Sequence, residues 1–271
     1  CMKGSEWAVN RCRQTVEEEE RKRMNETKDF VSKADLVYRG IDRIPEAGMP
    51  IGNGRMGSLI WYDQDEMHMQ WNRSDVFAND ATTQSFREES SDYNAGTGIV
   101  DLSMGTGKET VFTSKIRQHL EVYDGIYRME AESVTLEAFL DMAQDICYLH
   151  IQDRRNCPQK IRLSLRTLRG GSMYLTGTQS QTHPFLYKQK DYEKINTYVQ
   201  TGGHLATSVL ERQEDTIRLR QFFEEKEYIC QSLLEIRGDG RRVRAFLRNS
   251  NEAVLEWEAG NEELWITIRT A

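Results

Sequence analysis

An alternation of apolar and polar residues with a period of two is the feature that most constrains the fold of this chain. The segments 161–166 (IRLSLR) and 264–269 (LWITIR) place Ile or Leu at every second position, and 217–220 (IRLR) repeats this over a shorter stretch. Residues 115–123 follow the same pattern, except that Gln118 falls on the apolar face. Such alternation is typical of strands with one buried face.

Glycine-containing breaks separate these segments at short intervals, at residues 124–125, 170–171, 202–203, 238–240 and 260–261. Many short strands between tight turns predict antiparallel sheets, and one apolar face per strand predicts that two sheets pack together. The sequence therefore predicts an all-β fold, a large two-sheet antiparallel β-sandwich of the supersandwich type. With 271 residues the chain can bury such a core, and we expect the sandwich to cover residues 35–271.

The first 34 residues differ from the rest, because they are rich in charge and poor in β-branched residues. The acidic run 17–20 precedes the basic run 21–23 at spacings that form i,i+4 pairs on a helix. We therefore predict a helix from Ser5 to about Lys33, within an N-terminal helical segment covering residues 1–34. Its apolar stripe is thin, so we expect only its first half to pack on the outside of the sandwich. The stripe consists of Trp7, Ala8, Cys12 and Val16.

The overall charge argues against a nucleic-acid partner. The chain has a formal net charge of -7 and a pI near 5.4, whereas a phosphate-binding surface needs a broad excess of Lys and Arg. No run approaches the roughly 18 consecutive apolar residues of a membrane-spanning helix. The sequence predicts neither nucleic-acid binding nor a membrane span.

The chain begins with Cys1, which allows two interpretations. A mature bacterial lipoprotein begins with a lipid-bearing Cys, which predicts a periplasmic or extracellular domain anchored to a membrane surface. Alternatively, Cys1 marks only the boundary of an excised segment. The four other cysteines show no C-x-x-C spacing, so we expect buried free thiols at Cys12, Cys147, Cys157 and Cys230.

Gly52, Gly54 and Gly57 have the spacing G-x-G-x-x-G of the dinucleotide-binding fingerprint. That fingerprint requires a helix after the glycine turn, because the helix N-terminus binds the pyrophosphate. Here the turn is followed by residues 58–62 (SLIWY), which favour a strand, then by an acidic turn at 63–66 and a second alternating strand at 67–72. The sequence thus predicts a β-hairpin and no dinucleotide. We expect the glycines to let the chain turn where side chains would clash.

Other chemistry finds little support. The stretch GTGKET (105–110) lacks the Ser or Thr that would bind magnesium in a phosphate-binding loop, and the five histidines show no metal-ligand spacing. We predict no cofactor and no metal. A glycosidase needs two carboxyl groups around one bond, but the acids near the hairpin are more simply turn or N-cap residues. These acids are Asp75, Asp80, Asp92 and Asp101.

The polar stretch 177–201 is predicted to be a long loop.

The segment from Met49 to Phe77 (MPIGNGRMGSLIWYDQDEMHMQWNRSDVF) resembles the start of the N-terminal β-sandwich of large bacterial glycoside hydrolases similar to the alpha-L-fucosidases of glycoside hydrolase family 95. The resemblance rests on Pro50-Ile51-Gly52-Asn53-Gly54-Arg55 and Gly57, and it covers roughly residues 36–271 with motif support only in the first third. In that family the sandwich precedes an α/α barrel that carries the catalytic carboxylates. The stretch from Gln70 to Asp75 keeps the Asn but differs from the fucosidase-type continuation, so fucose specificity is not implied.

Two functions follow as expectations. In the first, the chain is a non-catalytic accessory domain of a glycoside hydrolase acting on complex glycans, and it packs against a C-terminal catalytic barrel of the same polypeptide. It carries no catalytic residue, and its candidate substrate-binding residues are Asn53, Arg55, Trp71 and Asn72. In the second, it is a free-standing carbohydrate-binding module whose exposed aromatic rings stack on sugars. The candidate rings are Trp71, Tyr93, Tyr187 and Tyr192.

Overall fold

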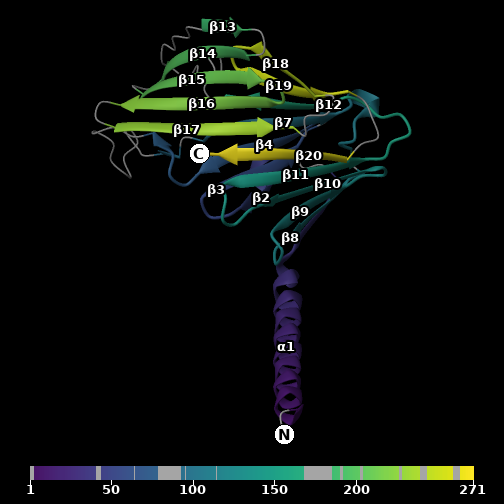
Figure 1. The fold of residues 1–271 in the computed structure, drawn as a ribbon. Coiled ribbons are helices and arrows are strands. Elements are labelled where there is room, and N and C mark those ends of the chain that lie inside the picture. Colours follow the sequence, from purple (N-terminus) through teal and green to yellow (C-terminus); the bar gives the residue numbers. More distant parts are fainter. Residues whose placement is uncertain are drawn as a thin grey trace.

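The computed structural model describes residues 3–40, 44–63, 65–78, 93–94, 96–113, 115–167, 185–189, 192–201, 204–225, 228–238, 243–258 and 263–271. Two large antiparallel sheets pack face to face, and one long helix extends from them (Figure 1). The predicted β-sandwich with an N-terminal helix is confirmed. The N-terminal helical segment ends at Ala34, and the division of the chain into two segments at residue 35 stays a prediction.

The larger sheet has eleven strands and contains the last strand of the chain near its centre. From edge to edge it consists of β1 (Leu36–Arg39), β8 (Arg117–Glu121), β9 (Ile126–Glu130), β10 (Val134–Leu140), β11 (Ile146–Asp153), β20 (Glu263–Thr270), β17 (Tyr228–Arg237), β16 (Thr216–Glu225), β15 (His204–Gln213), β14 (Tyr192–Thr201) and β13 (Phe185–Gln189). Strand β20 lies between β11 and β17. It therefore connects the strands from the first part of the sequence with those from the second part.

The smaller sheet has seven strands and lies behind the larger one in Figure 1. Its order is β18 (Val243–Asn249), β19 (Glu252–Trp257), β12 (Ile161–Arg166), β7 (Gly98–Met104), β4 (Glu66–Arg73), β3 (Met56–Tyr62) and β2 (Met49–Gly52). A two-stranded sheet pairs β5 (Phe77–Ala78) with β6 (Tyr93–Asn94), and short 3-10 helices cover Ser32–Ala34, Pro45–Ala47 and Gly107–Glu109.

The core lies between the two sheets and follows the predicted alternation. On β12, Ile161, Leu163 and Leu165 are at most 4% exposed, and on β20 the residues at 264, 266 and 268 are equally enclosed. Gln118 also faces inward, at 1% exposed, because it bridges buried groups. Its Nε2 donates to the backbone oxygen of Gly40 at 2.9 Å, and its Oε1 accepts from the Tyr127 hydroxyl at 3.1 Å. The polar break in the strand pattern is therefore a hydrogen-bonded core residue.

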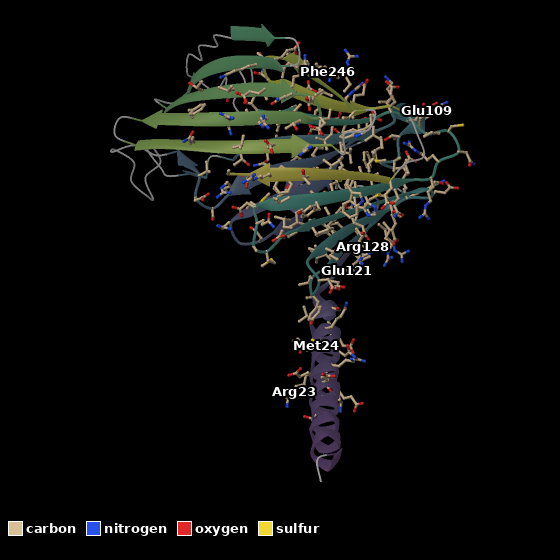
Figure 2. All side chains as sticks on the ribbon, viewed as in Figure 1. Arg23, Met24, Glu109, Glu121, Arg128 and Phe246 are labelled. Atoms are coloured by element: carbon tan, nitrogen blue, oxygen red, sulfur yellow. The ribbon has the colours of Figure 1, made fainter. Side chains whose placement is uncertain are left out.

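Helix α1 (Lys3–Val31) projects away from the sandwich, with its N-terminus farthest from the sheets (Figure 1). Figure 2 shows Arg23 and Met24 on this projecting part, and Met24 and Phe30 are 56% and 72% exposed. Contact with the domain comes at its C-terminal end, where Lys28 pairs with Asp124 at 2.7 Å. The expectation that its first half packs on the sandwich is wrong, because the helix meets the domain only at the end joined to β1. No helix in the described part of the chain is long and apolar enough to cross a membrane.

Two further expectations change. The predicted loop at 177–201 contains strands β13 and β14 over its second half, because Tyr192, Ile195, Tyr198 and Val199 favour a strand that pairs along β15. Residues 177–184 lie outside the described residues.

Cys147 is buried as expected, and burial raises its pKa to about 12, but Cys157 is exposed in the connection between β11 and β12. The side chains of Cys1, Cys12 and Cys230 lie outside the described residues.

Candidate functional site

The glycine turn joins β2 to β3, and β3 is followed by β4, so the predicted hairpin is confirmed and no helix follows the turn. The side chain of Asn53 holds this turn. Its Nδ2 donates to the backbone oxygens of Asp141 and Gln144, both at 3.1 Å, and to Oδ1 of Asp145 at 3.3 Å. Its Oδ1 accepts from two backbone N–H groups of the turn, at 3.0 and 2.9 Å. Asn53 thus ties the turn to the β10–β11 connection, and its contact with substrate stays a prediction.

Arg73, at the end of β4, lies at the centre of a charged group beside the turn. Its guanidinium forms a two-point pair with Asp75 at 2.7 and 2.8 Å, and Nη1 lies 3.0 Å from Oδ2 of Asp145. The same Nη1 donates to the hydroxyl and carbonyl oxygens of Thr270 at the end of β20. Arg55 approaches Asp145 at 3.3 Å, with a side chain that is 57% exposed. We call Asn53, Arg55, Arg73, Asp75 and Asp145 the turn cluster.

The charges of the turn cluster support one another. The hydrogen bond to Asp75 raises the pKa of Arg73, and the same bond lowers the pKa of Asp75. Burial by itself would raise the pKa of Asp145, but the hydrogen bonds from Arg73 and Asn53 outweigh it and lower that pKa. All three charged groups therefore stay ionised at neutral pH. The turn cluster is therefore a hydrogen-bonded structural network, in which Arg55 and Asp75 have the most exposed side chains, both at 57%.

The two other predicted substrate-binding residues lie on opposite faces of β4. Trp71 faces the core and is 0% exposed, so its ring cannot stack on a sugar, and the prediction that it is an exposed ring is wrong. The strand alternates, and Trp71 falls in the same inward register as Met67 and Met69. Asn72 is half-buried on the outer face, opposite Gly57 of β3. The rings of Tyr93, Tyr187 and Tyr192 lie outside the described residues.

The turn itself gives a testable prediction. Gly54 has a φ of +89°, and a side chain there would meet no atom within 4 Å, so only the backbone conformation favours glycine. We expect Gly54→Val to lower the free energy of unfolding by about 1–3 kcal/mol, because β-branched residues strongly disfavour positive φ. Chemical denaturation measures the change. Gly54→Asn is the matched control and should recover most of the loss, since Asn tolerates this region. Equal losses for Val and Asn would contradict the explanation.

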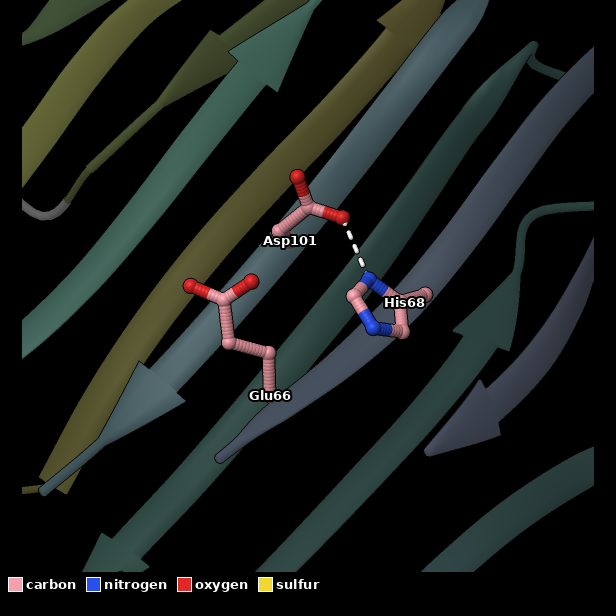
Figure 3. Close-up of side chains that lie close together, drawn as sticks. All are labelled: Glu66, His68 and Asp101. Atoms are coloured by element: carbon pink, nitrogen blue, oxygen red, sulfur yellow. Dashed lines mark hydrogen bonds and ion pairs between the residues drawn. The ribbon is translucent and has the colours of Figure 1, made fainter. Parts of the chain in front are cut away.

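A second polar group lies on the outer face of the seven-stranded sheet. His68 on β4 stands opposite Asp101 on β7, and His68 Nδ1 lies 2.6 Å from Asp101 Oδ1 (Figure 3). On its other side His68 Nε2 lies 3.1 Å from Asp63, while Arg166 on β12 holds the remaining oxygen of Asp101. His68 and Asp101 are only 8% and 3% exposed despite facing outward. They form a buried ion-paired network.

The network shifts the ionisation of its members in different directions. Burial alone would lower the pKa of His68, but the hydrogen bonds and charges of Asp101 and Asp63 outweigh it and raise that pKa. Burial alone would raise the pKa of Asp101, yet His68 and Arg166 lower it. Glu66 has a raised pKa, first because it is partly buried and second because Asp101 is a nearby like charge. The group therefore contains strongly paired charges beside one carboxyl that ionises less readily.

Three possible metal ligands meet in this network, since atoms of Glu66, His68 and Asp101 lie within 4.8 Å of one another (Figure 3). The sequence offered no ligand spacing here, because Asp101 comes from a neighbouring strand. A cation would compete with the guanidinium of Arg166 and the imidazole of His68 for the same carboxylate. The arrangement fits an ion-pair network better than a metal centre, and the absence of a metal stays a prediction.

An open hollow of about 580 Å³ lies beside the network, over the ends of β4, β7 and β12. Its lining is entirely polar or charged and consists of Asp63, Asp65, Glu66, Ser103, Thr106, Arg162 and Arg248. The pKa of Asp63 is lowered, because hydrogen bonds from two backbone N–H groups and His68 outweigh the effect of burial, whereas that of Glu66 is raised. Two carboxyl groups with oppositely shifted pKa values are the arrangement that acid–base chemistry uses.

Sequence reasoning missed this group because it treated the acids 63–66 as a turn and Asp101 as a turn or N-cap residue. Asp63, Asp65 and Glu66 do lie at the turn, where the Asp63 carboxylate accepts hydrogen bonds from the backbone N–H groups of Asp65 and Glu66. Asp101, however, stands in the middle of β7, so its assignment was wrong. The available signal was an acid inside the strand-forming run GIVDLSM, because a buried strand tolerates a carboxylate only with a partner.

Comparison with known proteins supplies the family but no activity. No curated protein matches the chain. Among solved structures, it is similar to one named "Putative kojibiose phosphorylase from human microbiome", with 12% identity and a TM-score of 0.47. That similarity covers 88% of this chain but 32% of the other, and it is too distant to carry over a function. Neither comparison names glycoside hydrolase family 95, so membership of that family stays a prediction.

The family model DUF5703_N, described as a domain of unknown function (DUF5703), matches residues 45–219. The match begins just before the glycine turn and ends within β16, in the second half of the larger sheet. It includes His68, Asp101 and the whole turn cluster. Because it covers well over half of the chain, the protein belongs to the DUF5703_N family.

Proposed function

We propose that this chain is the non-catalytic N-terminal β-sandwich of an enzyme that acts on complex glycans, and that it packs against a catalytic α/α barrel placed after Ala271. The proposal is supported by the two-sheet fold and by the resemblance of residues 50–57 to the hallmark turn of such sandwiches. It assigns the sandwich a positioning role, while the acid and base of the reaction belong to the barrel.

The observation that carries the proposal is where the turn cluster lies. Arg73 holds the carbonyl and hydroxyl of Thr270, and the Thr270 N–H donates to the backbone oxygen of Asp145 at 3.2 Å. The backbone of Ala271 exchanges two hydrogen bonds with Leu233 on β17, at 2.7 and 3.0 Å. The turn cluster and β17 therefore hold the backbone at residues 270 and 271. A barrel placed after Ala271, as proposed, would be oriented by these contacts.

The described carboxylates support a non-catalytic role. Buried acids have cationic partners: Asp101 pairs with Arg166, Asp145 with Arg73, and Asp153 with Arg155. Asp63 and Glu66 have oppositely shifted pKa values, as an acid–base pair would need. The Asp63 carboxylate, however, already binds two backbone N–H groups and His68. A glycosidase requires two carboxyl groups free to act on one bond. Glu66 is therefore the residue whose replacement best tests the opposite view.

The test is a comparison of activity. We expect purified residues 1–271 to show no turnover above background on a panel of aryl glycosides and plant or host oligosaccharides, because the chemistry resides elsewhere. A longer chain from the same gene, continuing past Ala271 through the next domain, should hydrolyse or phosphorolyse at least one of them. The matched control is Glu66→Gln in both chains, which should leave the activity of the longer chain unchanged.

Two results would contradict the proposal. Turnover by residues 1–271 that is abolished by Glu66→Gln would identify the hollow as an active site and the sandwich as the enzyme. An inactive longer chain, tested on the same panel with correct folding shown by circular dichroism, would remove the assignment to a glycan-active enzyme.

A further inference from the structure

The outer face of the eleven-stranded sheet carries an aromatic island, defined by Phe139, Tyr148, His150 and Trp265. These residues come from three adjacent strands, β10, β11 and β20. His150 stands opposite Trp265, and Phe139 stands opposite Tyr148. Tyr148 and His150 are two residues apart on β11, so all four side chains point to the same side of the sheet.

The rings are stacked in pairs across the strands. The centroids of His150 and Trp265 are 4.1 Å apart with an interplanar angle of 9°, and those of Phe139 and Tyr148 are 5.5 Å apart at 23°. Trp265 remains 43% exposed although His150 lies against its ring. One face of the indole is thus covered by His150, while 43% of the residue stays open to solvent. A partly exposed Trp stacked on another ring is worth explaining, because complete burial of its ring would be favourable.

Hydrogen-bonding groups surround the rings, and those that are charged are three carboxylates and one guanidinium. His150 Nε2 lies 2.6 Å from Glu263, and Glu137 on the other side pairs with Arg128. Arg128, labelled in Figure 2, also reaches Glu121 at 2.7 Å. The surface around the island is therefore rich in hydrogen-bond acceptors and carries more negative than positive charge. It suits an uncharged, hydroxyl-bearing ligand with an apolar face better than a phosphate.

The neighbouring part of the same face argues against a protein domain docked over it. Outward positions on β14 to β17 carry ion pairs, Lys194 with Glu211 and Arg218 with Glu235. Covering such charges with a protein surface costs desolvation energy that the pairs do not recover. The four rings of the island cover a small area, whereas a stable protein interface buries about 800 Å² on each partner. The island is the size of a small-molecule or sugar subsite.

From this geometry we propose that the aromatic island is a carbohydrate-binding site for a neutral oligosaccharide. The free face of Trp265 stacks on the apolar C–H face of a pyranose ring, and Glu137 and Glu263 accept hydrogen bonds from its hydroxyl groups. Tyr148 and Phe139, one register step along the sheet, contact the next sugar. The ligand class agrees with the proposed function, but the site needs no catalytic domain and lies apart from the turn cluster and the acidic hollow.

The experiment is isothermal titration of residues 1–271 with cellohexaose, xylohexaose, mannohexaose and laminarihexaose. We expect saturable binding of at least one, and we expect Trp265→Ala to weaken it about tenfold or more, because the principal stacking ring is lost. Trp265→Phe should retain part of the affinity. The matched control is Tyr123→Ala, which removes a ring that is 38% exposed at the β8–β9 turn and should leave binding unchanged. Tryptophan fluorescence of the wild type should shift on binding, and the shift should be lost in Trp265→Phe.

Three outcomes would overturn the inference. They are no saturable binding of any of the four sugars, binding that is insensitive to Trp265→Ala at unchanged melting temperature, and equal loss in the Tyr123→Ala control. If Trp265→Ala instead weakens assembly of the sandwich with the following domain while no sugar binds, the island is a protein interface. Failure of sugar binding together with an active longer chain would refute this site and leave the proposed function standing.

Discussion

Replacing Arg73 with Met should lower the free energy of unfolding by about 3–4 kcal/mol, because removal of one partner of a buried ion pair leaves the other uncompensated. Arg73 is 7% exposed, and Asp145, whose side chain is 15% exposed, would keep only the exposed Arg55 as a cationic partner. The carbonyl of Thr270 would lose a donor at the same time. Asp75 is 57% exposed and returns to water at little cost, so the loss comes mainly from Asp145 and Thr270. Urea denaturation followed by tryptophan fluorescence measures the change.

In Arg73→Met the loss of stability should be concentrated at the end of β20. The Thr270 N–H donates to the backbone of Asp145, and the turn cluster holds both residues, so amide hydrogen exchange at Thr270 and Ala271 should accelerate more than exchange in β12. Arg73→Lys keeps the charge but lacks the planar fork and should lie between the wild type and Arg73→Met. Arg55→Ala is the matched control, since Arg55 makes one exposed contact with Asp145, and should cost less than about 1 kcal/mol. A loss for Arg55→Ala as large as for Arg73→Met would contradict this ranking.

Replacing Asp101 with Ala should lower the free energy of unfolding by about 2–4 kcal/mol. Breaking a fully buried pair typically costs about 3–5 kcal/mol, and the lower figure reflects that Arg166 is 34% exposed and can reach water. His68 cannot escape in the same way, because its side chain is 11% exposed between two strands. Glu130→Ala is the control, since Glu130 and Arg117 form an exposed pair in the other sheet, at 53% and 50%, which should contribute less than about 1 kcal/mol. Near-equal losses in the two variants would refute a special role for the buried network.

The pH dependence of this difference follows from the two pKa shifts. The pKa of Asp101 is lowered in the folded state, so its stabilisation is present above the unfolded value of about 3.9 and is lost as pH falls through the folded pKa. The pKa of His68 is raised, so its stabilisation is complete below about 6.5 and is lost as pH rises through the folded pKa. The stability difference between wild type and Asp101→Ala should therefore be largest between about pH 4 and 6.5. His68→Asn should remove the decline on the alkaline side, and a difference that grows steadily to pH 9 would contradict the assignment.

The hairpin around the glycine turn could be predicted from the sequence because its determinants are local. Residues 58–62 and 67–72 alternate or favour strands, the acids between them form a tight turn, and a glycine supplies the positive φ at position 54. Each of these signals acts within a few residues. The same reasoning excluded a helix after the turn. It could not say what Asn53 and Arg55 contact, since their partner Asp145 lies about 90 positions further along the chain.

The two-sheet sandwich was determined by the sequence alone, because period-two alternation, short intervals between glycine-containing breaks, and one apolar face per strand all favour the same architecture. Only the tertiary structure decided which polar side chains meet. His68 and Asp101 are 33 residues apart and become neighbours through the pairing of β4 with β7, and Arg73 reaches Thr270 across 197 residues. The island of His150 and Trp265 exists because the last strand inserts beside β11. Alternation fixes the face on which a residue lies, but its neighbour on that face depends on strand order and register, which the whole chain sets together.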